Sequence, residues 1–162
     1  MMRDDVFIGL GSNLGDRLAH LRRATRLLET SGVEILAGSA VYETEPVDLR
    51  EQPPFLNQVY RVRTGLDPFD LLTCCKRIEG FLGRTAGPPK GPRVIDLDIL
   101  FYGRRKITAP ELILPHPALS RRRFVLVPLC ELAPDFEDCR SGLTIRELLA
   151  NCPDRSWVRP YA

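Results

Sequence analysis

The stretch Val94-Ile95-Asp96-Leu97-Asp98-Ile99-Leu100 is the part of the sequence from which the rest is best interpreted. β-Branched and aliphatic residues dominate it, and Gly91-Pro92 and Gly103 bound it, which predicts a strand. Side chains alternate between the two faces of a strand, so Asp96 and Asp98 point the same way, with Cα atoms about 6–7 Å apart. The sequence therefore predicts two neighbouring carboxylates on a strand face that is otherwise apolar.

Two carboxylates at that separation repel each other by roughly 3 kcal/mol at an effective dielectric constant near 20, so a cation must compensate them. Arg93 is the nearest side chain that could do so. A divalent cation is a better candidate, because Mg²⁺ is usually held by one or two carboxylates that leave positions for water and phosphate oxygen. The alternative is an open sheet face that carries two solvated acids.

Length and composition indicate an ordinary globular chain. The 162 residues suffice for one domain with a sizeable core, which we expect to span residues 1–162. Hydrophobic residues make up 44% and charged residues 27% of the chain. No apolar run approaches the ~20 residues of a membrane span, and the N-terminus lacks the apolar core of a signal peptide. We therefore expect a cytoplasmic protein without a membrane partner.

Charge and cysteine usage exclude several classes of function. The formal net charge is only +2, which argues against a dedicated nucleic-acid-binding protein, so no nucleic-acid partner is expected. The five cysteines are odd in number and contain no C-x-x-C pair, so neither a disulfide framework nor a zinc ribbon is supported. The sequence also lacks a Walker-type phosphate loop and the full G-x-G-x-x-G spacing of a dinucleotide site.

The periodicity of the first hundred residues predicts strand, helix, strand, strand, helix, strand. This order is typical of the ferredoxin-like βαββαβ fold, an α+β class with an antiparallel sheet and helices on one face. Two long Gly/Pro-rich loops would then lie free at one end, where functional residues often lie. The predicted strands are 6–10, 35–42, 56–64 and 94–100, the helices 16–30 and 67–83, the loops 43–54 and 84–92, and the later helical regions 116–133 and 144–150.

Two basic clusters could bind phosphate. Arg84 and Arg93 flank the loop that leads to the paired acids, and arginines commonly position and stabilise phosphoryl groups. His116 lies between two prolines, which stiffen its backbone, and its imidazole could donate to a phosphate. The alternatives are surface ion pairs for each arginine and a solvated helix end for the basic run 121–123.

A third cluster could bind a flat heterocycle. Asn57 begins a predicted strand and follows Phe55 closely. The amide offers a donor and an acceptor to the edge of a ring, while the aromatic side chain offers its face. The alternatives are an ordinary turn asparagine and an ordinary core phenylalanine.

Taken together and in this order, the motifs resemble the 6-hydroxymethyl-7,8-dihydropterin pyrophosphokinase family of folate biosynthesis. The G-P-R-x-x-D-x-D-I-L string is the most specific of them, and the resemblance extends over about residues 6–134. The matching stretches are I-G-L-G-S-N-L-G-D at 8–16, Y-E-T-E-P-V at 42–47, Q-P-P-F-L-N at 52–57, G-P-R-V-I-D-L-D-I-L at 91–100, L-P-H-P at 114–117 and R-R-F-V-L-V-P-L at 122–129.

The resemblance implies an ATP-dependent diphosphotransferase. Members of this family are mostly monomeric, so a monomer is expected. ATP would transfer its β,γ-pyrophosphoryl group to the hydroxymethyl oxygen of the pterin and leave AMP. Asp96 and Asp98 would hold two Mg²⁺ ions and, with Arg84 and Arg93, form the catalytic set. The family has no clear protein general base, which fits activation of the hydroxyl by metal.

The resemblance also implies two substrate subsites. The ATP subsite would use side chains for phosphates or ribose and one backbone segment for adenine: Arg84, Arg93, His116 and Arg122, with the backbone of Ile99. The pterin subsite would use Thr44, Asn57 and the backbone of Val47 for the ring edge, and Phe55 and Phe124 for the ring faces.

Two other interpretations remain open from the sequence. One is a non-catalytic ferredoxin-like module that binds nucleotide or RNA, which the sheet topology and the arginines allow. The paired aspartates argue against it, because acids on a binding face repel phosphate unless a metal intervenes. The other is a degenerate pyrophosphokinase that serves as a scaffold.

Overall fold

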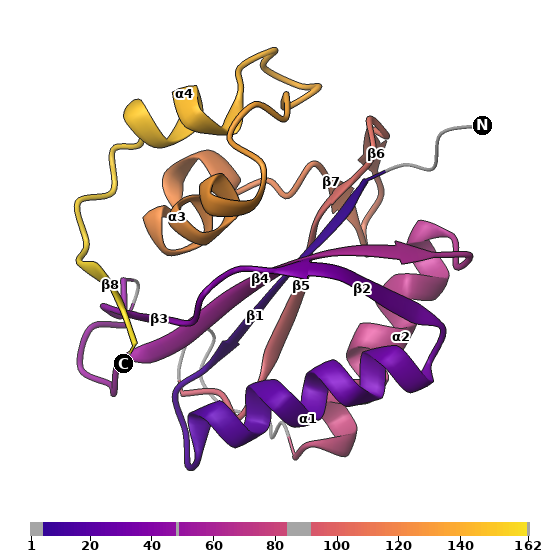
Figure 1. Ribbon diagram of the computed structural model, residues 1–162, viewed down its shortest axis with the longest axis vertical. Coiled ribbons are helices and arrows are strands. Elements are labelled where there is room, and N and C mark those ends of the chain that lie inside the picture. Colours follow the sequence, from indigo (N-terminus) through magenta and orange to yellow (C-terminus); the bar gives the residue numbers. More distant parts are fainter. Residues whose placement is uncertain (1–4, 48, 84–91, 162) are drawn as a thin grey trace.

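The fold is an antiparallel sheet with helices on both faces, here described from a computed structural model that covers residues 5–47, 49–83 and 92–161. The strand order is β5-β1-β4-β3-β8, and β2 also pairs with β4 (Figure 1). The strands are β1 (Val6–Ser12), β2 (Val33–Gly38), β3 (Tyr42–Thr44), β4 (Phe55–Thr64), β5 (Asp96–Tyr102), β6 (Ile107–Thr108), β7 (Ile113–Leu114) and β8 (Val158–Pro160). The helices are α1 (Arg17–Thr30), α2 (Pro68–Phe81), α3 (Arg123–Leu132) and α4 (Ile145–Ala150), with a 3₁₀ turn at Leu119–Arg121. The predicted α+β, ferredoxin-like βαββαβ core is confirmed.

Helices α1 and α2 begin where the sequence predicts them. Asp16 caps α1 by accepting a hydrogen bond from the backbone of Ala19, and Asp67 caps α2 by accepting one from Asp70. Pro68 occupies the first turn of α2, where no backbone donor is needed. Both helices bury apolar residues against one face of the sheet, which forms the first hydrophobic core.

The two helices of the βαββαβ core cover one face of the sheet, as predicted, but the cover on the opposite face was not predicted. The opposite face of the central strands carries Phe7, Val59 and Phe101, all at most 1% exposed, and α3 and α4 cover them. Phe136 completes this second core, with ring centroids 5.1 Å from Phe7 and 5.0 Å from Phe101. A central sheet with apolar residues on both faces needs cover on both, which the strand patterns alone did not reveal.

Several predicted boundaries also differ. The predicted helical region 116–133 is a 3₁₀ turn at Leu119–Arg121 followed by α3 from Arg123. The predicted strand 35–42 is two strands, since Ser39 leaves the ladder and instead hydrogen-bonds through its backbone and its hydroxyl to Val59. The second of them, β3, takes Glu43 and Thr44 from the predicted loop and pairs with β4. Strand β5 begins at Asp96, two residues later than predicted, so Val94 precedes it.

The register of β5 against β1 determines where the paired acids lie. Ile8 pairs with Ile99 and Phe7 with Phe101, so Leu100 is an extra residue in a bulge. Leu100 and Phe101 both contribute to the second core, whereas Ile99 contributes to the first. Strand alternation then places Asp96 and Asp98 on the second face, beyond the end of α3.

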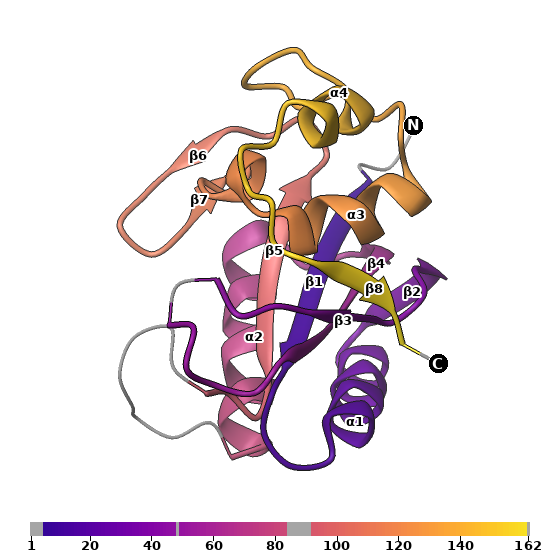
Figure 2. The same cartoon turned by 90° about the vertical axis from the view of Figure 1, so that its left-hand side faces the viewer.

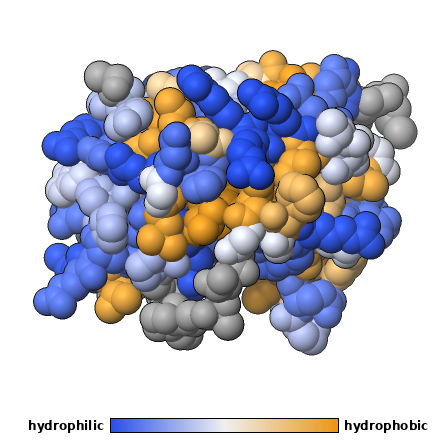
Figure 3. All heavy atoms as spheres, turned by 90° about the horizontal axis from the view of Figure 1, so that it is seen from below, coloured by the Kyte–Doolittle hydropathy of each residue, from blue (hydrophilic) through white to orange (hydrophobic). Residues whose placement is uncertain are grey.

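The surface carries scattered large apolar side chains, as most globular proteins do. When the molecule is viewed from below its orientation in Figure 1, apolar residues form a band between hydrophilic ones (Figure 3). The most exposed large apolar side chain among the described residues is Phe81, at 73%. In the part of the chain that the structure describes, we find no helix long and apolar enough to cross a bilayer.

Candidate active site

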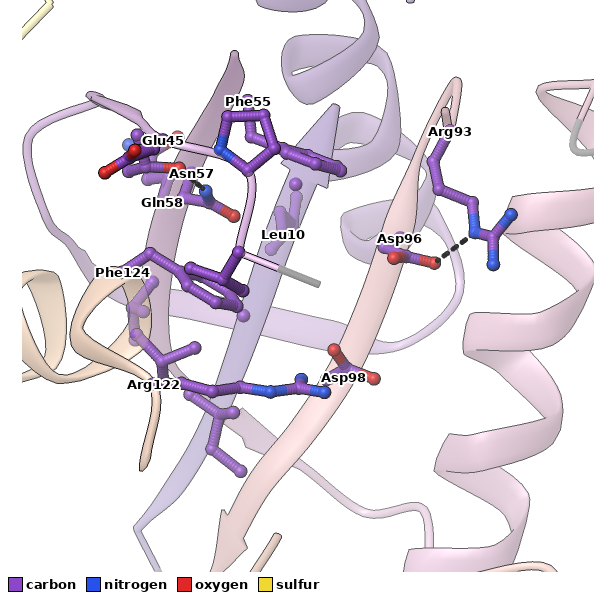
Figure 4. A pocket seen from close by; sticks show the side chains of 18 residues that line it. Leu10, Glu45, Phe55, Asn57, Gln58, Arg93, Asp96, Asp98, Arg122 and Phe124 are labelled. Atoms are coloured by element: carbon purple, nitrogen blue, oxygen red, sulfur yellow. Dashed lines mark hydrogen bonds and ion pairs between the residues drawn. The ribbon is translucent and has the colours of Figure 1, made fainter. Parts of the chain in front are cut away.

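A pocket opens on the second face of the sheet, between β5 on one side and β3 and β4 on the other (Figure 4). It brings together nine of the residues that the sequence singled out: Thr44, Val47, Phe55, Asn57, Arg93, Asp96, Asp98, Arg122 and Phe124. We call residues 44–47, Phe55 and Asn57 the amide wall, and Asp96 and Asp98 the acid wall. These segments are distant in sequence, so the fold itself assembles the pocket.

The acid wall has the geometry that strand alternation predicts. Figure 4 shows Asp96 and Asp98 projecting from β5 toward the same pocket. Their side chains are 35% and 45% exposed, and Arg93 Nε lies 3.8 Å from Asp96 Oδ1. Both carboxylates are therefore accessible from the pocket.

His116 adds a neutral donor beside the acid wall. Its Nε2 lies 3.9 Å from Asp98 Oδ1, and its Nδ1 accepts a hydrogen bond from the backbone N–H of Ala118. Burial, together with the nearby positive charge of Arg122, lowers the pKa of His116 to about 4. The imidazole is thus neutral at pH 7, and because Nδ1 accepts, Nε2 carries the proton and faces the acid wall.

Arg122 spans the pocket from the start of α3. Its guanidinium points toward Asp98 in Figure 4 and lies 5.7 Å from the ring centroid of Phe124. It is the N-cap residue of α3 and makes no side-chain cap hydrogen bond. This long, always charged side chain can therefore contact an anion that binds above the acid wall.

The amide wall is buried and internally hydrogen-bonded. Asn57 is 8% exposed and Thr44 1% exposed, and the Asn57 amide donates to Thr44 Oγ1 at 2.7 Å. Gly11 lies opposite Asn57 in the β1–β4 register, and a Cβ at position 11 would lie 2.7 Å from Asn57 Oδ1. The floor of the pocket is therefore shaped to admit this amide.

Two predicted ATP-binding residues lie outside the lining of this pocket, and one lies outside the described residues. His116 lies beside it, as stated above. Ile99 is 4% exposed with its side chain in the first core, so only its backbone could contact a ligand. The Leu97 N–H donates to Glu79 of α2, and Ile99, two residues on, directs its backbone to the same outer edge of β5. Arg84 falls within residues 84–91, which the structure does not describe.

Sequence reasoning missed Asn13, which it treated as part of a turn. Asn13 is 2% exposed, and its amide donates to Gln52 Oε1 at 2.9 Å and to the Pro53 carbonyl at 3.0 Å. Its Oδ1 accepts from the backbone of Arg93 at 2.7 Å, and its own N–H donates to the Arg93 carbonyl. Asn13 thus fastens two loops to the end of β1. No local signal could reveal this, because its partners lie about forty and eighty residues away.

Comparison with known sequences agrees with the assembled site. Residues 7–134 match the family described as 7,8-dihydro-6-hydroxymethylpterin-pyrophosphokinase. The chain is 44% identical over 137 residues to the 2-amino-4-hydroxy-6-hydroxymethyldihydropteridine pyrophosphokinase of Bacillus subtilis, covering 84% of this chain and 82% of that protein. It is 46% identical over 129 residues to the mitochondrial folate synthesis bifunctional protein of Pisum sativum, covering 80% of this chain but only 25% of that protein.

Solved structures agree on the fold. The crystal structure of Plasmodium falciparum HPPK-DHPS A437G with STZ-DHP superposes with a TM-score of 0.74 at 17% identity, covering 92% of this chain and 45% of that one. At that identity the likeness concerns the fold alone. The family match over residues 7–134 and the 44% identity to the Bacillus subtilis enzyme establish that the chain belongs to the 7,8-dihydro-6-hydroxymethylpterin-pyrophosphokinase family.

Proposed function

We propose that this chain transfers pyrophosphate from ATP to 6-hydroxymethyl-7,8-dihydropterin, with Mg²⁺ bound at the acid wall and the pterin at the amide wall. Membership of the family confirms the predicted reaction class, a pyrophosphokinase of folate synthesis that uses ATP. The observation that carries the residue assignment is a single pocket with two carboxylates on one side and a buried amide–hydroxyl pair on the other.

The donor set of the acid wall suits Mg²⁺. Among the residues that the structure describes, no group of three or more His, Cys, Asp or Glu side chains could enclose a metal. Mg²⁺ does not require such a cage, because it retains waters and takes phosphate oxygens beside one or two carboxylates. We propose two ions held by Asp96 and Asp98, where they would neutralise phosphate charge and lower the pKa of the attacking hydroxyl.

The basic side chains around the acid wall would hold the triphosphate. Arg93 and Arg122 approach Asp96 and Asp98 from two directions (Figure 4). Their two guanidinium groups can therefore bind the oxygens of a phosphate that lies between the two arginines. His116 would donate from its neutral Nε2, which adds no charge to the site. The backbone of Ile99, at the outer edge of β5, would read adenine. These contacts align the triphosphate for transfer, which is most of what phosphoryl-transfer catalysis requires.

The amide wall would hold the pterin. Asn57, Thr44 and the backbone of Val47 offer donors and acceptors for the ring edge, while Phe55 and Phe124 offer aromatic faces. Because Asn57 and Thr44 already bond to each other, their orientation exists before the pterin arrives. We propose that no side chain acts as general base.

The test is a direct product assay on the purified chain. With ATP, Mg²⁺ and 6-hydroxymethyl-7,8-dihydropterin, we expect one AMP for each pterin diphosphate formed. EDTA should abolish AMP formation, and added Mg²⁺ should restore it. Absence of AMP would support the degenerate scaffold, and release of ADP instead would contradict pyrophosphate transfer.

The nucleotide- or RNA-binding module is the alternative from another class. Its test is a filter-binding assay with RNA in EDTA, where we expect no retention because the exposed carboxylates repel phosphate. Tight binding without metal would favour that module.

We further propose that the chain forms a single domain, since β8 joins the same sheet as β1. We also propose a monomer, which analytical ultracentrifugation would test. The cytoplasmic location stays a prediction.

A further inference from the structure

The last strand of the described chain lies against the amide wall. Strand β8 pairs with β3 in antiparallel register, with Val158 opposite Thr44 and Arg159 opposite Glu43. Figure 2 shows β8 lying beside β3, far in sequence but adjacent in space. Strand β3 has only three residues, so β8 converts a short edge strand into an internal one.

Two hydrogen bonds extend this pairing into the pocket lining. The backbone N–H of Glu45 donates to the Trp157 carbonyl at 3.1 Å, and the Trp157 N–H donates to Glu45 Oε1 at 3.1 Å. Glu45 lines the pocket directly after Thr44. The C-terminal segment therefore fixes both the backbone and the side chain of a residue in the amide wall.

A charged cluster strengthens the same junction. Glu43 Oε1 accepts from Arg159 at 2.7 and 3.2 Å, and Oε2 accepts from Arg17 at 3.0 Å. These hydrogen bonds, chiefly those from Arg159, lower the pKa of Glu43. Arg17 also donates to the Pro54 carbonyl at 2.9 Å, next to Phe55. The Glu43 carboxylate thus connects β3 to β8 and α1, and Arg17 extends the cluster to the residue before β4.

Aromatic contacts hold the arginines in place. The Arg159 guanidinium lies 4.5 Å from the ring centroid of Trp157, and that of Arg17 lies 5.6 Å from the ring centroid of Tyr161. Such contacts restrict the rotamers of long side chains that would otherwise move freely. The segment 157–161 therefore acts as one unit against β3.

We propose that Arg159 and Trp157 are positioning residues for the pterin, acting through Glu43 and Glu45 on the amide wall. This rests on the proposed function of that wall. A wall that is loose before binding must be ordered on binding, which weakens affinity. The acid wall lies on β5, at the other end of the strand order, so ATP contacts should be unaffected.

The experiment uses the full chain with three single substitutions. Arg159→Glu places a negative charge beside Glu43, Arg159→Lys keeps the positive charge, and Arg146→Glu is the control. Arg146 forms an ion pair of similar length, 3.1 Å to Asp135, but on α4 away from the pocket. Steady-state assays at saturating Mg²⁺ then give kcat and separate KM values for pterin and ATP.

For Arg159→Glu we expect the pterin KM to rise about tenfold, with kcat and the ATP KM within about twofold of wild type. Arg159→Lys should retain a pterin KM within about threefold of wild type, and Arg146→Glu should leave it unchanged. A merely structural role would raise both KM values or lower the amount of active enzyme. Equal changes in both KM values, or an unchanged pterin KM, would overturn the proposal.

A measurement without substrate separates this inference from the proposed function. In Arg159→Glu, the backbone N–H groups of residues 42–45 should exchange with solvent about tenfold faster than in Arg146→Glu. If the wild type formed no AMP, the proposed function would fail, while faster exchange would still support the positioning of this wall by β8. Unchanged exchange would reject the inference even in an active enzyme.

Discussion

The amide wall and the acid wall of the pocket differ in how much of their structure exists before a ligand binds. Thr44 and Asn57 are buried and joined by a 2.7 Å hydrogen bond. The Asp96 and Asp98 side chains are 35% and 45% exposed, with Arg93 Nε 3.8 Å from Asp96 Oδ1 and His116 Nε2 3.9 Å from Asp98 Oδ1. Both carboxylates line the pocket and are partly exposed, so water and cations can reach the acid wall.

The difference suggests a division of labour. A preformed wall of amide and hydroxyl groups suits a neutral heterocycle, whose binding then needs little reorganisation. A wall of accessible carboxylates suits Mg²⁺, whose coordination shell is completed by phosphate oxygens when the nucleotide binds. Substitutions in the amide wall should therefore change affinity, and those in the acid wall should change turnover.

The largest effect should come from the acid wall. Asp96→Ala and Asp98→Ala should each lower kcat by about 10²–10³-fold, because each removes charge stabilisation of the transferring group. Steady-state AMP release measures this, with Asp135→Ala, at an exposed ion pair on the second face, as the control. A variant with wild-type kcat would show that its carboxylate holds no essential metal.

Substitution of the amide wall tests the other half of the comparison. Asn57→Ala should raise the pterin KM by about tenfold to a hundredfold, since it removes hydrogen bonds to the ring edge and leaves Thr44 unpaired. The double variant Asn57→Ala/Thr44→Val removes both partners and should recover the melting temperature without recovering the KM. Recovery of the KM would assign the effect to folding rather than to pterin recognition.

Asn13 connects the loops that flank both walls. Asn13→Ala removes the hydrogen bonds to the Arg93 N–H and the Pro53 carbonyl, so the free energy of unfolding should fall by about 1–3 kcal/mol. Both KM values should rise together, unlike in the variants above. Urea denaturation measures the first effect, and Asn151→Ala, at the exposed end of α4, is the control. A change in one KM alone would contradict the connecting role.

The smallest effect concerns the pH dependence of the Glu43 cluster. The pKa of Glu43 is lowered from 4.5, so its ion pairs stabilise the fold above that value and are lost as the pH falls below it. Arg159 is 65% exposed, so water screens much of the interaction. Wild type should lose more stability than Glu43→Gln as the pH falls below 4.5, measured by urea denaturation. Parallel pH profiles would show that Glu43 contributes nothing to this loss.

The central fold was predictable because its signals are local. Period-2 and period-3.6 patterns predicted the βαββαβ order, and the starts expected near Asp16 and Asp67 agree with the caps of α1 and α2. Helix α3 was also expected, but its place over Phe7 and Phe101 depends on which face of each strand remains uncovered. That property belongs to the assembled sheet and not to any one segment.

The site was predictable where short motifs carry it and not where distant segments meet. Strand alternation correctly placed Asp96 and Asp98 on one face, and Phe124 and Arg122 entered the same pocket. The C-terminal segment had no functional interpretation from the sequence, because Trp157 meets Glu45 across 112 residues. Its contacts follow from sheet pairing, which a single sequence without periodic signal does not specify.

The contact between position 11 and Asn57 limits how this pocket can be redesigned. Any side chain at Gly11 would drive its first carbon into the Asn57 amide oxygen, and that amide cannot swing aside without leaving Thr44. A library that randomises the pocket floor to admit bulkier heterocycles should therefore keep glycine at this codon and vary Val47 and Phe124 instead. Survivors with another residue at 11 should carry a compensating change at 57.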